Sequence, residues 1–344
     1  MAQAFHVKLR KKINPLMQKF FRRLIIKEVQ NRPIELDKIK RVIIVRVNYR
    51  IGNIIFTTPL INALSQLLPD VKIDMIIGAS FVTPLMEGMP NINRVYSFKR
   101  DLLKHPLEML KLKRELNQNS YDLMILPSGS STSDAMMSWA VDATYKVGFY
   151  NENSSKRLTN VIDAEENLIH EALKPLALLK ALGVEDIYRF NHYLDLKITK
   201  SEREESRVKN SIGIFRDARG EKKIENRWWQ ELVDVLQELN PKIEFIDILD
   251  PNNQEPLNRT IDTISEKNLR ILASKIANLD AFICADTGPM HLASASLVPT
   301  IALFKTTSPI KYGTLGERDL SIVIKDKSIK DIAIEIYTHF YKLV

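Results

Sequence analysis

Short β-branched runs alternate with amphipathic stretches along most of the chain. Runs such as 42–47 (VIIVRV) and 281–285 (AFICA) are apolar at nearly every position, which is typical of strands buried on both faces of a parallel sheet. Strands that alternate with helices indicate βαβ crossovers. The predicted strands are 42–47, 71–78, 92–98, 121–129, 145–150, 211–215, 242–249, 281–285 and 300–305. The predicted helices are 57–69, 81–88, 101–118, one from 132–134 onward, 165–183, 225–239, 266–279 and 289–297.

The alternation breaks at 190–210, where a short-stranded stretch becomes strongly charged. A chain of 344 residues is also longer than one hydrophobic core normally supports, which is about 250 residues. We therefore predict two doubly wound α/β domains that face each other across a cleft. They comprise residues 39–200 and residues 201–344, and an extension of residues 1–38 precedes them. The C-terminal helix can pack back on the N-terminal domain.

The net charge of +8 comes entirely from the first 40 residues, which hold eleven lysines and arginines against three acidic residues. The other 304 residues contain 39 basic and 39 acidic side chains, which argues against a nucleic-acid-binding protein. Apolar residues at 17, 20, 21, 24 and 25 share one helix face in this extension. Such a helix can bind an anionic membrane surface through residues 8–29, or it can pack on the protein's own body with a solvated basic face.

Cysteine usage and the absence of long apolar runs bear on location. Cys284 is the single cysteine and lies within the apolar run 281–285, so we predict a buried core thiol. No stretch of the sequence approaches the ~20 apolar residues that span a bilayer, and no secretory signal is recognisable. These features favour a reducing, cytoplasmic location.

Three loops follow predicted strands, where open parallel sheets bind their ligands. In 48–53 (NYRIGN), Gly52 allows a tight turn or a close backbone approach ahead of a helix N-terminus that can bind an anion, although such a glycine is often structural. The loop 216–223 (RDARGEKK) holds four basic residues in eight. Arginine forks and a mobile lysine suit a diphosphate, and a solvated charged loop is the alternative.

The third loop, 286–291 (DTGPMH), combines a strand end with a short helix. Asp286 can accept hydrogen bonds from sugar hydroxyls, while Thr287 and the free N–H groups of the helix start can bind phosphate or sugar. His291 lies within the first helical turns. A lone histidine there is more often structural, but we favour a functional role beside Asp-Thr-Gly.

The run V-R-V-x-x-R-I-G-N-I-I-F-T-T-P-L-I-x-A-L, together with A-D-T-G-P-M-H-L-A-S-A-S-x-x-P-T-I-A-L-F, resembles glycosyltransferase family 9, the lipopolysaccharide heptosyltransferases and their relatives. The resemblance covers residues 40–325. It implies a GT-B fold of two Rossmann-like domains and an inverting, metal-independent transfer without a cofactor. It also implies a nucleotide-sugar donor, usually ADP-heptose, and a lipid-linked core oligosaccharide acceptor. The enzyme would then act from the cytoplasm, peripherally on the inner face of the inner membrane.

Carried over by position, the family's donor-phosphate lysine falls on Lys222, and its donor-sugar motif falls on the 286–291 loop. The loop after 300–305 adds Thr307 as a polar contact. The candidate donor contacts are Arg216, Arg219, Lys222, Asp286, Thr287, Gly288, His291 and Thr307. The candidate acceptor contacts are Arg50, Gly52, Ser128 and Ser130. No His/Cys cluster with metal-ligand spacing and no D-x-D motif occurs in the sequence, so no metal is expected.

The sequence departs from the family at the proposed general base. Many relatives read R-I-G-D where this chain has R-I-G-N, so Asn53 stands in place of that aspartate. An amide can position a hydroxyl but cannot take its proton near neutral pH. Three explanations remain open: another carboxylate, with Asp134 the best-placed candidate, serves as base; the donor phosphate or water activates the acceptor; or the chain is catalytically weak or inactive.

Two rival functions use the same fold. One is an enzyme of this family with another donor, such as a UDP-hexosamine. The other is a non-catalytic, membrane-associated protein that binds sugars or nucleotides and has lost its base.

Overall fold

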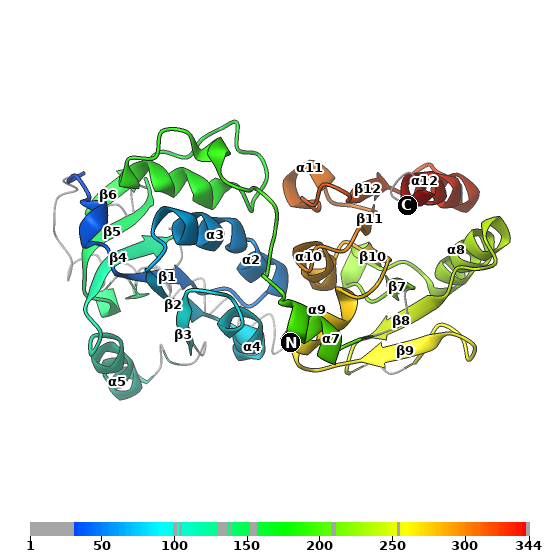
Figure 1. Ribbon diagram of the computed structural model, residues 1–344, viewed down its shortest axis with the longest axis horizontal. Helices are drawn as coiled ribbons and strands as arrows, with labels where there is room; N and C mark the ends of the chain where they lie inside the picture. The colour runs from blue at the N-terminus through cyan, green and yellow to red at the C-terminus, as the bar shows by residue number, and fades with distance from the viewer. Residues whose placement is uncertain are drawn as a thin grey trace, which may run out of the picture.

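The structure, a computed structural model, describes residues 31–98, 102, 105–128, 136–137, 139–151, 157–207, 211–252 and 255–341. Over these residues the chain forms two α/β units side by side, each built on a six-stranded parallel sheet (Figure 1). The predicted pair of doubly wound α/β domains is therefore confirmed. The predicted basic helix and the helix predicted to begin at 132–134 lie largely outside the described residues.

The N-terminal sheet has the order β3-β2-β1-β4-β5-β6. Its strands are β1 (Arg41–Arg46), β2 (Lys72–Ile77), β3 (Ile92–Ser97), β4 (Tyr121–Leu126), β5 (Ala143–Phe149) and β6 (Asn160–Ile162). The helices of this part are η1 (Leu36–Lys38), α2 (Ile51–Ile55), α3 (Thr58–Leu67), η2 (Ser80–Val82), α4 (Thr83–Glu87), α5 (Pro106–Leu116), η5 (Lys174–Leu182) and η6 (Ile187–Arg189).

The C-terminal sheet has the order β12-β11-β10-β7-β8-β9. Its strands are β7 (Ile212–Phe215), β8 (Phe245–Leu249), β9 (Asp262–Ser265), β10 (Ala281–Ala285), β11 (Thr300–Phe304) and β12 (Leu320–Val323). The helices are α7 (Lys200–Glu205), η7 (Gly220–Lys222), α8 (Asn226–Leu239), α9 (Leu269–Ile276), α10 (Gly288–Ala295), α11 (Pro309–Tyr312) and α12 (Ile329–Tyr341).

Both sheets follow the same plan. In each, the first strand in sequence pairs with the second on one side and with the fourth on the other, so the winding reverses between β1 and β4 and between β7 and β10. Ligands of doubly wound sheets bind at this switch point, beyond the carboxyl ends of the strands. All three candidate loops follow strands at a switch point: 48–53 follows β1, 216–223 follows β7 and 286–291 follows β10.

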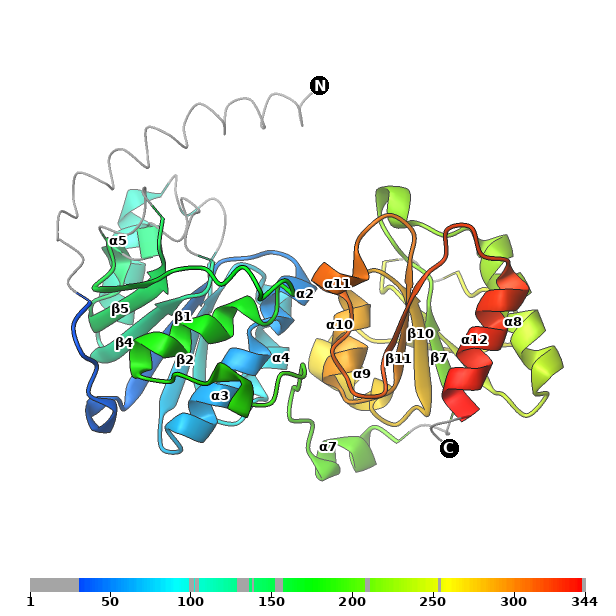
Figure 2. The ribbon, with the colours of Figure 1, turned by 90° about the horizontal axis from the view of Figure 1, so that it is seen from above.

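The largest apolar core crosses from one domain to the other. It includes Ile54 and Phe56 beside α2 of the N-terminal domain and Met290 and Leu292 of α10 in the C-terminal domain. Figures 1 and 2 both place α2 against α10 at the junction of the two domains. Smaller cores fill the other face of each sheet, beneath α5 in the N-terminal domain and beneath α8 and α12 in the C-terminal domain.

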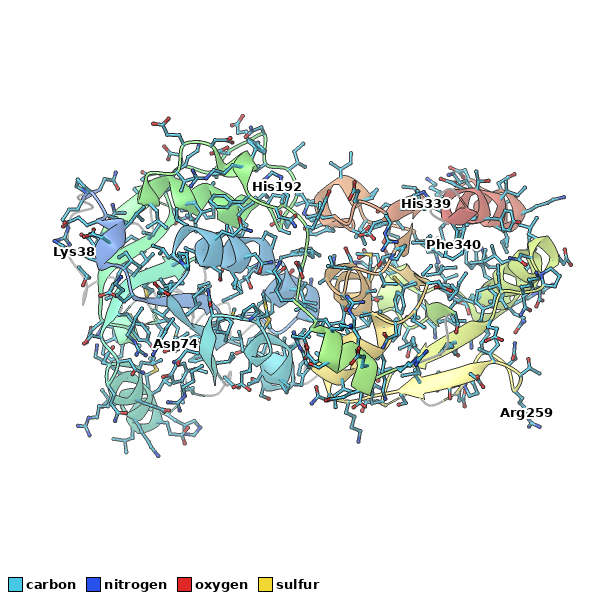
Figure 3. The ribbon with its side chains drawn as sticks, viewed as in Figure 1. Lys38, Asp74, His192, Arg259, His339 and Phe340 are labelled. Carbon is cyan, nitrogen blue, oxygen red and sulfur yellow. The ribbon has the colours of Figure 1, made fainter. Side chains whose placement is uncertain are left out.

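The C-terminal helix corrects one expectation. α12 packs against α8 of its own domain rather than on the N-terminal domain. Ile332, Ala333 and Ile336 share a core with Trp229 of α8, and Phe340, labelled in Figure 3, packs against the same core. Because α8 already offers an apolar stripe beside β12, the helix buries its own stripe there without crossing the domain boundary.

Three short strands and one helix differ from the expected pattern. β6, β9 and β12 are edge or near-edge strands of three or four residues, too short to give a clear alternation. The helix expected at 165–183 is a 3-10 helix over Lys174–Leu182, and Gly183 ends it with φ +76° as the sequence indicated. The predicted core thiol is confirmed, since Cys284 is free and fully buried.

Candidate active site

Strand register brings the donor-side loops to one level. Cys284 of β10 pairs with Phe215 of β7, and Ala285 pairs with Leu303 of β11. The chain therefore leaves these three neighbouring strands at the same edge of the sheet. Residues that follow them, including Lys222, Asp286 and Thr307, are consequently able to meet above that edge.

Asp286 is the centre of this cluster. Its carboxylate is buried. Its Oδ2 accepts a hydrogen bond from Thr307 Oγ1 and forms an ion pair with Lys222 Nζ at 2.5 Å. The lysine side chain keeps 36% of its surface exposed, and an ammonium has three donors, so its bond to Asp286 leaves capacity for a ligand. Three of the predicted donor residues, from three different loops, are thus in direct contact.

The N-terminus of α10 adds polar groups beside Asp286. Thr287 is the N-cap residue, but its side chain caps no helix N–H. Its Oγ1 is buried without a hydrogen-bond partner in the described part of the chain. The first amides of a helix also lack intrahelical partners and favour an anion. A buried hydroxyl without a partner at such a helix start is the arrangement that a ligand oxygen would satisfy.

His291 lies on α10 between the two domains. Its ring is buried and stacks edge-on with Phe56, with 4.5 Å between ring centroids. Burial is the main cause that lowers the pKa of His291 to about 3, against the opposing effect of Asp286, so the ring is neutral at physiological pH. Its Nδ1 has no hydrogen-bond partner within the described residues.

His170 packs against the same Phe56 ring as His291. It stacks with Phe56 at 5.5 Å between centroids, and its Nε2 donates to the carbonyl of Gly313 across the domain boundary at 3.0 Å. Its Nδ1 accepts the N–H of Ala172 at 3.2 Å, which fixes the neutral tautomer. Burial lowers the pKa of His170, in agreement with that tautomer.

Gly52 has a structural role that the sequence left open. A Cβ atom at this position would lie 2.4 Å from Cδ2 of His291, so only glycine lets α2 approach α10 this closely. At the domain seam, where α2 of the N-terminal domain packs against α10 of the C-terminal domain, a Cβ on Gly288 would lie 3.3 Å from Cβ of Ile51. The loop predicted to hold the acceptor is therefore packed directly against the helix predicted to hold the donor sugar.

The other predicted acceptor residues are more dispersed. Arg50 is exposed and begins α2, and its N–H is held by Oδ1 of Asn48 at 2.9 Å. Asn53 is partly exposed on α2, and its carbonyl accepts Nε of Arg46 at 3.1 Å. Ser128 is exposed just beyond β4. Ser130 and Asp134 lie outside the described residues.

Arg216, predicted to contact the donor, makes most of its hydrogen bonds within the protein. Its guanidinium makes a bidentate pair with Asp247 at 2.8 and 3.2 Å and also bonds Asn226 and the carbonyl of Glu255. Four of its five N–H donors are thus bound within the protein. Arg216 fixes the loops after β7 and β8, whereas Arg219 is exposed at the start of η7.

The sequence analysis missed the residues that join the two domains. His170 and Lys311 belong to no motif, and Phe56 lies in the family-like run 45–64 without being singled out there. Their partners lie far away in the sequence; Lys311 accepts the N–H of Glu171 through its carbonyl at 3.1 Å. It also missed an acidic hollow beyond β7 and β8, lined by Asp217, Asp250 and Glu255 around Arg216. The Asp-Pro pair at 250–251, directly after a strand, was the available signal for that hollow.

No three His, Cys, Asp or Glu side chains among the described residues are grouped so that they could hold a metal ion. No helix in that part of the chain combines the length and apolarity needed to cross a bilayer.

Sequence comparisons relate most of the chain to one family. The profile of glycosyltransferase family 9 (heptosyltransferase) matches residues 109–335. Lipopolysaccharide heptosyltransferase 3 of Escherichia coli (strain K12) is 25% identical over 285 residues, which cover 75% of this chain and 81% of that protein. A putative lipopolysaccharide heptosyltransferase 4 of the same strain is 22% identical over 98% of this chain and 96% of its own length.

Solved structures show the same fold. A glycosyltransferase family 9 protein from Veillonella parvula DSM 2008 superposes with a TM-score of 0.77 at 20% identity, over 91% of this chain and all of that chain. The E. coli heptosyltransferase WaaC, solved with ADP-2-deoxy-2-fluoro heptose, gives a TM-score of 0.72 at 17% identity, over 88% of this chain and all of that chain. These superpositions bear out the predicted GT-B fold.

Proposed function

Because the chain belongs to glycosyltransferase family 9 and is a glycosyltransferase, we propose that it transfers a sugar from a nucleotide sugar to the core oligosaccharide of a lipopolysaccharide or lipooligosaccharide. The observation that carries this proposal is the meeting of Lys222, Asp286 and Thr307 at the switch point of the C-terminal sheet. Relatives named lipopolysaccharide heptosyltransferase support the acceptor class, and a neighbour solved with an ADP-heptose analogue supports ADP-heptose as the donor.

In this proposal the C-terminal domain binds the donor. Lys222 and Arg219 neutralise the diphosphate, and the free N–H groups at the start of α10 donate hydrogen bonds to its oxygens. Asp286 accepts hydrogen bonds from sugar hydroxyls, while Thr287 Oγ1 gains the partner that it lacks in the described structure. The neutral ring of His291, on α10, orients the sugar without adding a positive charge.

The N-terminal domain presents the acceptor through Arg50, Asn53 and Ser128. The acceptor hydroxyl attacks the anomeric carbon from the face opposite the diphosphate, and the bond from that carbon to the phosphate oxygen breaks, which inverts the configuration. The basic loop stabilises the charge that develops on the leaving diphosphate. The hydroxyl proton goes to a group other than Asn53, either the carboxylate of Asp134 or a donor-phosphate oxygen or water.

The proposed enzyme works without a metal or cofactor, on the cytoplasmic face of the inner membrane. The charge of the leaving diphosphate is matched by side chains and helix amides rather than by a divalent cation. Residues 8–29, which carry most of the net positive charge, would attract the protein to anionic lipid.

The test is a reaction with purified core acceptor and a panel of nucleotide sugars that includes ADP-heptose and a UDP-hexosamine. We expect ADP release from ADP-heptose only when acceptor is present, an inverted anomeric configuration in the product by NMR, and full activity in excess chelator. Release from the UDP-hexosamine instead would redirect the donor assignment. Binding of nucleotide sugar without any acceptor-dependent release would support the non-catalytic alternative and contradict the proposal.

A further inference from the structure

Helix α5 presents an outward face that is both apolar and cationic. Leu107 is 80% exposed and Leu110 is 47% exposed, although both lie on a helix whose other side is packed on the sheet. Lys111 and Arg114 are exposed beside them. We propose that these four residues form a docking face for an anionic lipid surface, separate from residues 8–29.

Helix geometry places the four residues on one stripe. Positions 107, 110, 111 and 114 are spaced i, i+3, i+4 and i+7, so their side chains fall within one face of an α-helix. The opposite side carries Met109 and Leu116, which are buried. The four positions hold no acidic residue; the exposed Glu108 lies at the side of the stripe, about 100° around the helix from Leu107 and about 60° from Lys111.

The flanks of α5 are bound to the protein, which fixes the direction of the stripe. Glu115 pairs with Arg94 of β3 at 2.6 Å on one side. Lys113 donates to the carbonyl of Trp139 at 3.1 Å on the other. With both flanks and the inner side engaged, the remaining face points away from the domain.

Topology relates this face to the proposed acceptor edge. α5 follows β3, which ends at Ser97, and leads into β4, which begins at Tyr121. A helix that connects parallel strands starts near the carboxyl end of the first strand, so Leu107 and Leu110 lie toward the same sheet edge as Arg50 and Asn53. A lipid surface on α5 would therefore lie toward the edge where a lipid-linked acceptor has to enter.

Charge complementarity favours lipid over a segment of this chain as the occupant. Residues 1–40 are strongly basic, and the α5 stripe carries two cations and no anion, so the two surfaces repel each other. An anionic bilayer attracts both, with about 1 kcal/mol from each basic residue near the surface, and it accepts the two leucines in its interfacial region.

A fluorescent label on α5 tests the contact directly in the full chain. The single native cysteine is fully buried, so a polarity-sensitive probe such as NBD will label an introduced Leu107→Cys selectively. On vesicles that contain phosphatidylglycerol we expect a blue shift and a fluorescence rise of roughly twofold or more, with quenching by spin-labelled lipid. The matched control is Leu239→Cys, 39% exposed at the end of α8. Figure 1 shows α8 and α5 at opposite ends of the molecule.

A double substitution tests the energetic contribution. Leu107→Gln with Leu110→Gln should weaken partition onto the same vesicles about tenfold, because two partly inserted leucines are removed. Leu239→Gln should leave partition unchanged, and all variants should keep wild-type transfer to a delipidated core acceptor. The proposal is overturned if the chain does not bind these vesicles, if the probe at 107 responds no more than the probe at 239, or if the double variant partitions normally.

Discussion

The donor edge of the C-terminal sheet and the acceptor edge of the N-terminal sheet share one topology but are built differently. At the donor edge, loops after β7, β10 and β11 converge on the carboxylate of Asp286. At the acceptor edge, the loop after β1 turns at once into α2, and Gly52 of that helix packs against His291. One switch point is thus assembled around a charged group, while the other is used largely to hold the two domains together.

This difference explains where chemistry is concentrated. Lys222 and Thr307 both contact the carboxylate of Asp286, and a fixed arrangement of this kind suits the preorganisation that transition-state stabilisation requires. On the acceptor side the predicted polar contacts within the described residues are an exposed arginine, an amide and a serine. We therefore expect substitutions at the donor edge to affect transfer far more than substitutions on the exposed side of α2.

The largest effect should come from Asp286→Asn. The amide keeps the shape of the side chain but removes the charge that holds Lys222, so kcat/KM should fall about 100- to 1,000-fold. Acceptor-dependent release of nucleoside diphosphate measures this loss. The exposed Asp262→Asn on β9 is the matched control and should stay within twofold of wild type. Near-normal transfer by Asp286→Asn would remove the contrast between the two edges.

Gly52→Ala tests the packing role of the acceptor edge. The added methyl would meet the His291 ring, so unfolding free energy in denaturant should drop by about 1–3 kcal/mol. The same substitution should cost clearly less in a His291→Ala background, where the ring is gone. A cost that is equal in both backgrounds would show that the contact with His291 is not what Gly52 provides.

The domain seam should also respond to acid. The pKa values of His170 and His291 are lowered in the folded protein, the latter to about 3. In the unfolded chain their pKa is about 6.5, so below that pH each ring takes up a proton when the protein unfolds. Their contribution to stability is complete above that pH and is lost as the pH falls below it, down to about 3 for His291, at up to about 1.4 kcal/mol per pH unit for each ring.

Stability measured from pH 7 to pH 4 in wild type and in His291→Asn checks this prediction. The advantage of wild type should shrink as the pH falls, because the asparagine side chain does not titrate. His339→Gln on α12, at a partly exposed histidine away from the domain seam, is the control and should keep the wild-type slope. Parallel profiles for wild type and His291→Asn would contradict a buried neutral histidine at the seam.

Asn53→Ala should have the smallest effect on transfer. The amide cannot serve as the base, so its loss removes at most one positioning hydrogen bond, and kcat should fall less than tenfold. Steady-state rates at saturating donor give the comparison with Asp286→Asn. If both substitutions were equally severe, the acceptor edge would be as important to the chemistry as the donor edge.

Local sequence patterns were enough to predict the fold and to single out the residues that meet at Asp286, whose role in binding the donor stays a prediction. β-branched runs marked the long strands, and strand-end loops marked Lys222 and Asp286, because both signals depend on neighbouring residues. Arg216 shows the limit of that approach. Its charge suited a diphosphate, but its partner Asp247 lies 31 residues away on β8, and only the folded sheet brings the two together.

The domain seam could not be predicted from the sequence for the same reason. Gly52 and His291 come from opposite ends of the chain, and each has a plausible local reading on its own. His170 and Phe56 are ordinary residues until the fold stacks them with His291. The docking of α12 on α8 likewise depends on which apolar stripe is nearest in space.

The most direct test of the donor-edge account is titration calorimetry of ADP against wild type, Lys222→Ala and Lys223→Ala. The two lysines are adjacent, but only Lys222 reaches Asp286, while Lys223 is exposed and its carbonyl accepts Lys305. We predict that Lys222→Ala weakens ADP binding about tenfold or more and that Lys223→Ala stays within twofold of wild type. Equal effects of the two substitutions, or none from Lys222→Ala, would contradict the assignment of the diphosphate to the Asp286 cluster.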